Sequence, residues 1–239
     1  HMAWILTAYT LAITVAMPVY GKLGDLVGRK NLFLVAIGLF LAGSALCGTA
    51  SGMAQLIVYR ALQGLGGGGL MISSQAITGD LIPPRVRGTY MAPMGAMFGI
   101  ASILGPIAGG WLTDSVSWRW AFWINLPLGV LAFIAIAFVL RLPTSRLTSP
   151  IDWWGLTLMD AGAAALVLMA TWGGNQYGWT SPVIICLGMA GLVCWGLFMF
   201  AQTRAVDPIL PWAILTNRTF IVATVVGMLA MGGMIGVMS

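Results

Sequence analysis

Long apolar stretches, separated by short segments that hold most of the charged residues, dominate the hydropathy pattern of the chain. A helix needs about 20 residues to cross the ~30 Å hydrocarbon core of a bilayer, and each stretch is about that long. The stretches lack polar/apolar alternation and exceed the strands of membrane barrels, so we expect helices. The pattern predicts an all-α, polytopic bundle of about eight membrane-spanning helices, over residues 3–20, 31–49, 54–77, 89–112, 121–140, 154–172, 182–202 and 219–238.

Basic residues fall mainly in one of the two sets of loops that connect these helices. If the first helix runs from outside to inside, nine of the 11 Lys and Arg residues lie in the inward set: Lys22, Arg29, Lys30, Arg85, Arg87, Arg141, Arg146, Arg204 and Arg218. The outward set holds only Arg119, and Arg60 lies within the third stretch. The positive-inside rule therefore predicts a multi-pass protein of the bacterial inner membrane with residue 1 on the outer side. Because such proteins usually start in the cytoplasm, and because no polar tail follows the last stretch, we expect a piece of a longer protein.

Composition narrows the class of protein further. Hydrophobic residues make up 59% of the chain and charged residues 7%, whereas about a quarter of the residues in soluble domains are charged. The net charge of +5 is spread over several loops, which does not indicate a nucleic-acid partner. The three cysteines lie in apolar stretches without metal or redox spacing, so we expect neither metal nor cofactor. The chain also lacks the clustered His, Asp and Glu residues that a membrane enzyme would need.

The segment 21–30, between the first two predicted helices, reads Gly-Lys-Leu-Gly-Asp-Leu-Val-Gly-Arg-Lys. Its three glycines allow a tight turn where two helix ends come close. Asp25 stands where a carboxylate can cap the N-terminus of the following helix. A charged turn that merely obeys the positive-inside rule would have a similar composition.

Arg60 is the one basic residue inside a predicted membrane helix, where insertion costs about 2.5–3.5 kcal/mol. Such a guanidinium is expected either to face a wet cavity or a partner, or to extend its head group to the interface. Gln63, Gly64 and a run of four glycines at 66–69 follow it, and glycines permit close helix contact. No Gly-Lys-Ser/Thr sequence follows, so this is not a phosphate-binding loop. No nucleotide-binding domain is visible elsewhere in the sequence, so we expect an ion gradient rather than ATP to supply the energy for any work that the protein does across the membrane.

Two further segments combine glycine, proline and aromatic residues. Segment 99–110 ends in Gly-Pro-Ile-Ala-Gly-Gly, in which Pro106 removes a backbone donor and the glycines let a neighbouring helix approach. Segment 118–129 reads Trp-Arg-Trp-Ala-Phe-Trp-Ile-Asn-Leu-Pro-Leu-Gly, an interfacial aromatic anchor followed by the start of a helix that carries Asn125. We expect the role of this last segment to be structural.

Together these four motifs, in this order and spacing, resemble the major facilitator superfamily, and in particular its 14-helix drug:proton antiporters. The resemblance implies that the first segment is a cytoplasmic latch, which stabilises one state of alternating access and is formed by Gly21, Asp25, Gly28, Arg29 and Lys30. Asp80, the only acid in the next inward loop, is the expected partner of Arg29. Leu26 departs from the family pattern, which often has a basic residue there.

The resemblance also implies two groups of transport residues. Arg60, Gln63 and Gly64 match the motif linked to proton transfer. The antiporter signature, which is associated with exporters, falls on Gly105, Pro106, Gly109 and Gly110. Ala101 stands where the family commonly has glycine.

The resemblance further implies a domain organisation and a function. Residues 1–140 would be most of the N-terminal six-helix half without its first helix, 141–203 an inserted helix pair, and 204–239 the start of the C-terminal half. The implied function is export of hydrophobic or cationic drugs in exchange for protons, with a small-molecule substrate, protons and membrane lipid as partners. Export of a metabolite or sugar, and a non-transporting sensor, are the alternatives.

Polar residues outside the motifs supply further candidates for the transport cavity. Asp160 lies about eight residues into its predicted helix, where it would be a proton site, a cation contact or a structural hydrogen-bonding group. Thr7, Thr10 and Thr14 recur at helical spacing and could line the cavity with Asn125, although threonines also bond their own backbone. The 15 methionines would suit a pocket that adapts to varied hydrophobic cations, but methionine is also an ordinary filler of membrane bundles.

Overall fold

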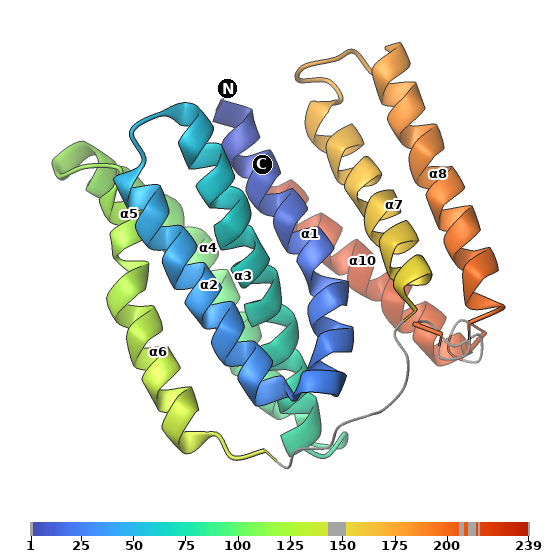
Figure 1. The fold of residues 1–239 in the computed structure, drawn as a ribbon, viewed down its shortest axis with the longest axis horizontal. Helices are drawn as coiled ribbons and strands as arrows, with labels where there is room; N and C mark the ends of the chain where they lie inside the picture. The colour runs from blue at the N-terminus through green and yellow to red at the C-terminus, as the bar shows by residue number, and fades with distance from the viewer. Residues whose placement is uncertain (1, 143–151, 206–207, 210–213, 215, 239) are drawn as a thin grey trace.

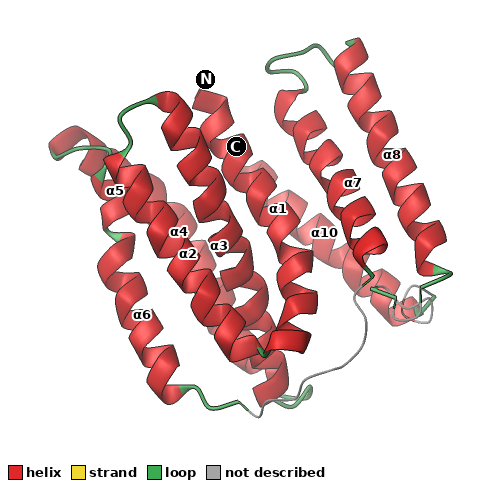
Figure 2. Cartoon of the chain, in the orientation of Figure 1, coloured by secondary structure: helices red, strands yellow, loops and turns green. Residues whose placement is uncertain are grey.

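The computed structural model describes residues 2–142, 152–205, 208–209, 214 and 216–238. Figure 1 shows the helices α1 (Met2–Val27), α2 (Arg29–Thr49), α3 (Met53–Leu81), α4 (Arg87–Ser115), α5 (Trp120–Trp123), α6 (Asn125–Val139), α7 (Trp153–Trp172), α8 (Pro182–Gln202) and α10 (Arg218–Met238). Within the described residues there is no strand, as Figure 2 shows. The one β-type contact among them is an isolated bridge between Gly173 and Tyr177. The prediction of an all-α bundle is confirmed, and α5 followed by α6 fills the predicted span 121–140.

Most of the long helices have the length and apolar character that a membrane crossing requires. Six spans meet both criteria, and α5 and α6 together count as one of them. The other five are α1, α2, α4, α7 and α8. α3 is not among them, because its glycines and polar residues lower its hydropathy. It nevertheless has the most extensive contacts in the molecule, with α1 on one side and α2 on the other. The least apolar long helix therefore lies at the centre of the bundle.

Glycines of α3 make this central packing possible. A Cβ atom at Gly64 would lie 2.6 Å from the Tyr9 carbonyl oxygen of α1, and one at Gly66 would lie 2.8 Å from the Ala36 carbonyl oxygen of α2. Real Cβ atoms do not approach so closely, so only glycine fits at these positions. The close helix contact predicted for this glycine run is confirmed.

The turn between α1 and α2 is shorter than the sequence suggested. α1 continues through Gly21 and Asp25 to Val27, and Gly28 alone forms the turn with a positive φ of 101°. Gly28 is also the N-cap of α2, and no side chain caps that helix. The prediction that Asp25 caps the following helix is therefore wrong, because Asp25 still belongs to the last turn of α1.

Helices α7 and α8 form a hairpin that packs on α1 through α7. Asp152 caps α7, since its Oδ1 accepts from the Gly155 amide at 2.9 Å, and its Oδ2 accepts from Gln202 Nε2 of α8 at 2.8 Å. At the other end of α7, Trp172 meets Trp4 of α1 edge to face, with ring centroids 5.2 Å apart.

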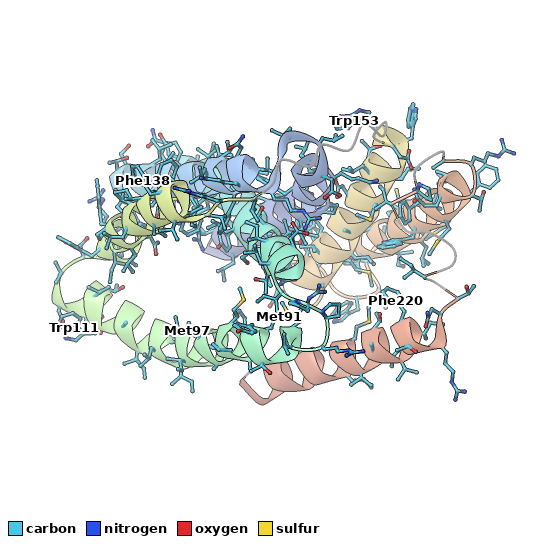
Figure 3. The ribbon with its side chains drawn as sticks, turned by 90° about the horizontal axis from the view of Figure 1, so that it is seen from below. Met91, Met97, Trp111, Phe138, Trp153 and Phe220 are labelled. Atoms are coloured by element: carbon cyan, nitrogen blue, oxygen red, sulfur yellow. The ribbon has the colours of Figure 1, made fainter. Side chains whose placement is uncertain are left out.

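Helix α4 has no buried residue along its 29 residues, a property that it shares with α5 and α6. Its few contacts are with α3, to which it is joined in sequence, and with the short α5. Figure 3 shows Met97 and Trp111 on α4, away from the group formed by α2, α3 and α6.

Candidate functional site

Arg60 turns into the bundle from α3. Its Nη1 donates to Gln63 Oε1 one turn later, at 2.9 Å. The guanidinium carbon lies 4.3 Å from the ring centroid of Tyr9 on α1 and 5.5 Å from that of Phe122 on α5, which are cation–π distances. Of the two expectations for Arg60, a partner inside the protein therefore agrees with the structure better than extension to the interface.

The charge of Arg60 is not neutralised within the part of the chain that the structure describes. No carboxylate there lies within ion-pair distance of it, and its Nε is buried without a hydrogen-bond partner. A guanidinium has five N–H donors, so Arg60 retains the capacity to bind a further acceptor.

A buried polar network extends from Arg60 to α2, α5 and α6. Gln63 is only 2% exposed, and its Nε2 donates to Ser44 Oγ of α2 at 3.0 Å. Asn125 Nδ2 of α6 donates to the same oxygen at 3.1 Å, and Ser44 donates to the Phe122 carbonyl at 2.9 Å. Of the predicted site residues, the structure brings Arg60, Gln63 and Asn125 together here.

Gly64 allows α1 to approach α3 closely beside this network. A Cβ at this position would lie 2.6 Å from the Tyr9 carbonyl oxygen and 2.8 Å from Ala12 Cβ. The absence of a side chain lets α1 come close enough to place the Tyr9 ring over the Arg60 guanidinium.

A second cluster lies where α1, α2 and the end of α3 meet. Arg29 Nη2 bonds Asp25 Oδ1 at 2.9 Å, and Arg29 Nη1 contacts Asp80 Oδ1 at 2.6 Å and the Ala76 carbonyl at 2.9 Å. We call Asp25, Arg29 and Asp80 the latch cluster. Its side chains are between 30% and 44% exposed, and ion pairs of this kind contribute about 0–1 kcal/mol each. Such a contact is weak enough to open and close.

Lys30 was predicted to belong to the latch, but it has a different partner. Its Nζ donates to the Ala137 carbonyl in the last turn of α6 at 2.7 Å, where a positive charge complements the helix C-terminus. Of the two latch glycines, Gly28 makes the turn, whereas Gly21 has open space around it.

The antiporter signature lies on the exposed helix α4. Hypothetical Cβ atoms at Gly105, Gly109 and Gly110 meet no atom within 4 Å, and Pro106 lies within a continuous helix. The neighbouring helix that these glycines were expected to admit is not found among the described residues.

The remaining candidates are dispersed. Thr7 is buried, whereas Thr10 is exposed, and the Thr14 hydroxyl donates to the Thr10 carbonyl at 2.9 Å, so Thr14 bonds its own backbone. Asp160 of α7 is 8% exposed, and its Oδ1 is buried without a hydrogen-bond partner in the described part of the chain. A structural hydrogen bond, one of the alternatives for Asp160, is thus not seen at this atom.

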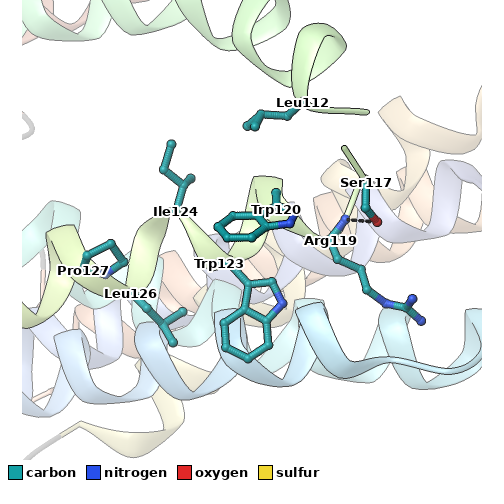
Figure 4. A pocket seen from close by; sticks show the side chains of 8 residues that line it. All are labelled: Leu112, Ser117, Arg119, Trp120, Trp123, Ile124, Leu126 and Pro127. Carbon is teal, nitrogen blue, oxygen red and sulfur yellow. Dashed lines mark hydrogen bonds between the residues drawn. The ribbon is translucent and has the colours of Figure 1, made fainter. Parts of the chain in front are cut away.

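The aromatic segment 118–129 forms an apolar cavity of about 550 Å³ beside the end of α4 (Figure 4). Its lining residues are Leu112, Ser117, Arg119, Trp120, Trp123, Ile124, Leu126 and Pro127. Arg119 Nη2 donates to the carbonyl of Ala50, the C-cap of α2, at 3.0 Å. This contact agrees with the structural role expected for the segment.

Four residues of the Arg60 network were not recognised from the sequence: Tyr9, Ser44, Cys47 and Phe122. Cys47, whose Sγ lies 4.0 Å from Gln63 Oε1, is one of the three cysteines that lie in apolar stretches without a recognisable spacing. Ser44 is a single small polar residue in an apolar helix, and no spacing connects it to Gln63 or Asn125. The nearest signal was the polar character of Gln63 itself, which must find a buried partner.

Comparison with known proteins agrees with the motifs. A family model described as Major Facilitator Superfamily matches residues 1–236. The chain is 40% identical over 237 residues to "Multidrug transporter protein MdtP" of Bacillus subtilis, covering 98% of the chain and 43% of that protein. It is 39% identical over 227 residues to "Multidrug resistance protein 3" of the same organism, covering 95% and 44%.

A third relative is similar to the same extent. "Efflux pump dotC" of Dothistroma septosporum is 40% identical over 221 residues, which cover 90% of the chain and 38% of that pump. The chain thus spans less than half the length of these curated relatives. Because the family model matches almost every residue, the chain belongs to the Major Facilitator Superfamily.

Proposed function

We propose that the chain works as part of a secondary transporter that exports hydrophobic or cationic drugs in exchange for protons, without enzymatic activity. The relatives' names describe multidrug transporters and efflux pumps, which supports export of such compounds. The observation that carries the proton-coupled part is Arg60: a guanidinium inside a membrane helix, held by Gln63 and two aromatic rings, with no carboxylate partner in the described residues.

A fixed positive charge at this place has a defined electrostatic effect. Arg60 stays protonated, so it favours the ionised form of any acid of the transport cavity that approaches it, and it repels a cation from the same place. A proton that neutralises this cavity acid removes the attraction between the acid and a cationic drug. Binding of protons and binding of drug thereby become mutually exclusive, which is what exchange requires.

Alternating access needs a contact that holds one state and then releases it. The latch cluster joins the ends of α1, α2 and α3 through partly exposed ion pairs, which suits this role. We place this end of the bundle in the cytoplasm and residue 1 outside, as the distribution of Lys and Arg favours. We further propose that α1–α6 belong to the N-terminal half, that α7 and α8 are an inserted pair, and that the C-terminal half starts near residue 204.

The orientation is tested by labelling introduced cysteines in intact cells with an impermeant maleimide. Asn175→Cys, in the connection between α7 and α8, should react from outside, and Arg85→Cys, after α3, should react only in broken cells. The opposite pattern would reverse the proposed orientation.

The exchange itself is tested by proton movement in everted membrane vesicles that carry the protein at its full natural length. Adding a lipophilic cation such as ethidium should dissipate an imposed pH gradient with wild-type protein and not with Arg60→Ala. Arg204→Ala, which removes a guanidinium outside the network, is the matched control and should behave as wild type. If no cation tried affects the gradient with wild-type protein, proton-coupled drug export is wrong for this protein.

A further inference from the structure

A buried serine that belongs to none of the motifs joins three other elements beside Arg60. Ser44 of α2 has no exposed surface, and its hydroxyl makes three hydrogen bonds. It donates to the Phe122 carbonyl at 2.9 Å and accepts from Gln63 Nε2 at 3.0 Å and Asn125 Nδ2 at 3.1 Å. A hydroxyl offers one donor and two acceptor positions, so every position of Ser44 is in use.

The order of donors and acceptors in this network runs in one direction. The Phe122 carbonyl can only accept, so the Ser44 proton points to it and the Ser44 oxygen is left to accept. Gln63 must therefore turn its NH₂ group toward Ser44, and its carbonyl oxygen faces Arg60, which can only donate. The backbone of α5 thus determines, through Ser44, which end of the Gln63 amide meets the guanidinium.

We propose that Ser44 is a positioning residue for Arg60, because it holds the Gln63 amide in the orientation in which the carbonyl oxygen binds the guanidinium. The effect on coupling rests on the proposed function, whereas the effect on Gln63 does not. Without the hydroxyl, the buried NH₂ group of Gln63 loses its acceptor, the half-buried NH₂ group of Asn125 keeps only the Ala121 carbonyl at 3.5 Å, and the Phe122 carbonyl loses its side-chain donor. Buried amides do not stay unpaired at no cost, so Gln63 and Asn125 turn toward the vacant carbonyl and Gln63 releases Arg60 in part of the population.

Cys47 provides a readout of this orientation that is independent of transport. Its Sγ lies 4.0 Å from Gln63 Oε1, in the geometry of a weak S–H donor to that oxygen. The S–H stretching band in the infrared falls where other protein groups do not absorb, and it shifts when the thiol donates. We would record it with Cys47 as the only cysteine of the full-length protein, with Cys186, Cys194 and any others replaced by alanine.

In the infrared experiment, Ser44→Ala should add a second S–H component at the position of a thiol that does not donate, because the amide no longer presents only its oxygen. Ser44→Thr, which keeps a hydroxyl, should retain the single shifted band. Ser74→Ala is the matched control, since the Ser74 hydroxyl only bonds the Met71 carbonyl of its own helix. An unchanged band in Ser44→Ala would overturn the inference.

In the vesicle assay, Ser44→Ala should lower the maximal rate of proton-driven drug export by about tenfold and change the KM for drug by less than about twofold. Ser44→Thr should recover most of the rate, and Ser74→Ala should match wild type. Equal losses of rate, drug binding and thermal stability would indicate a merely structural serine and overturn the inference. The inference would also be overturned if Ser44→Ala changed the S–H band but exchanged drug for protons at the wild-type rate.

The two experiments also separate this inference from the proposed function. If Ser44→Ala alters the S–H band but wild-type protein moves no protons with any drug, proton-coupled export fails and the positioning of Gln63 by Ser44 stands. If wild-type protein couples normally and Ser44→Ala changes neither band nor rate, export stands and the role of Ser44 fails.

Discussion

Helices α3 and α4 have the same length of 29 residues, and each carries a glycine-rich motif, but they differ completely in their surroundings. In α3, hypothetical Cβ atoms at Gly64, Gly66 and Gly68 would collide with the backbones of α1 and α2. In α4, those at Gly105, Gly109 and Gly110 meet no atom within 4 Å. A small-residue motif therefore becomes a packing surface only where a partner helix is present.

The same contrast applies to polar groups. α3 places Arg60, Gln63 and Ser73 in half-buried or buried positions between its neighbours. The hydroxyls of Ser102 and Thr113 on α4 bond only carbonyls of their own helix. Side chains of α3 thus take part in hydrogen bonds between helices, as Gln63 does with Ser44 of α2, whereas α4 makes such a bond only at its first residue, Arg87, among the described residues.

The largest effect is expected from filling the closest helix contact. Gly66→Val on α3 places a side chain against the Phe40 Cα atom (2.7 Å from the new Cβ) and the Ala36 carbonyl oxygen (2.8 Å). Overpacking against backbone should cost about 3 kcal/mol or more and lower the unfolding temperature by about 10 °C. Heating followed by size-exclusion chromatography measures this shift. Gly38→Val on α2, where no atom lies within 4 Å, is the control, and an equal fall there would attribute the loss to helix propensity rather than packing.

The joint between the two helices should give the next largest effect. Arg87, the first residue of α4, donates through Nη2 to the Gly79 carbonyl in the last turn of α3 at 2.7 Å. Arg87→Ala leaves that carbonyl unpaired and should cost about 1.5–2 kcal/mol, with faster proteolysis in the connection between α3 and α4. Arg85→Ala, an exposed arginine two residues earlier, is the matched control. Equal proteolysis of both variants would show that the Arg87 contact does not hold the joint.

The sequence predicted elements better than contacts. Apolar length located the helices, because membrane thickness fixes how many residues each needs. The turn at Gly28 and the capping role of Asp25 were wrong in detail, because helix α1 tolerates Gly21 and Gly24 and ends only where a positive φ is required.

For the candidate site, the sequence identified the residues whose charge or polarity is unusual in a membrane helix. Arg60 and Gln63 stand out in this way. Asp80 is the only acid in the inward loop after α3, which made it the expected partner of Arg29. Ser44 could not be recognised, because its importance arises from where α5 and α6 cross α2, and no local pattern encodes that crossing. Lys30 could not be assigned either, since its partner on α6 lies 107 residues away.

A smaller effect is expected at the end of α3 that forms the latch cluster. Asp80→Asn removes one of the two carboxylates from Arg29 and leaves the contacts with Asp25 and Ala76 in place. A partly exposed ion pair should contribute about 0.5 kcal/mol, and the difference between variant and wild type should vanish in ~1 M salt, where charges are screened within about 3 Å. Unfolding temperatures at low and high salt measure it, with Gln75→Ala, an exposed position on the same helix, as control. A difference that persists in high salt would mean that Asp80 acts by something other than charge.

The smallest effect is expected from Gly109→Ala on α4, and its comparison with Gly64→Ala on α3 distinguishes the two helices most directly. Alanine at Gly64 of α3 would place its Cβ 2.6 Å from the Tyr9 carbonyl oxygen, so Gly64→Ala should destabilise the protein. Gly109→Ala of α4 meets open space, and alanine is better than glycine in a helix by up to about 1 kcal/mol, so its unfolding temperature should stay level or rise slightly. Both variants are measured side by side, in this chain and in the protein at its full natural length. If Gly109→Ala lowers the unfolding temperature only at full length, a helix outside the described residues packs on the antiporter signature, and α4 then uses its glycines as α3 does. If it lowers the temperature in this chain as well, the open surroundings of α4 are wrong, and the contrast between the two helices no longer holds.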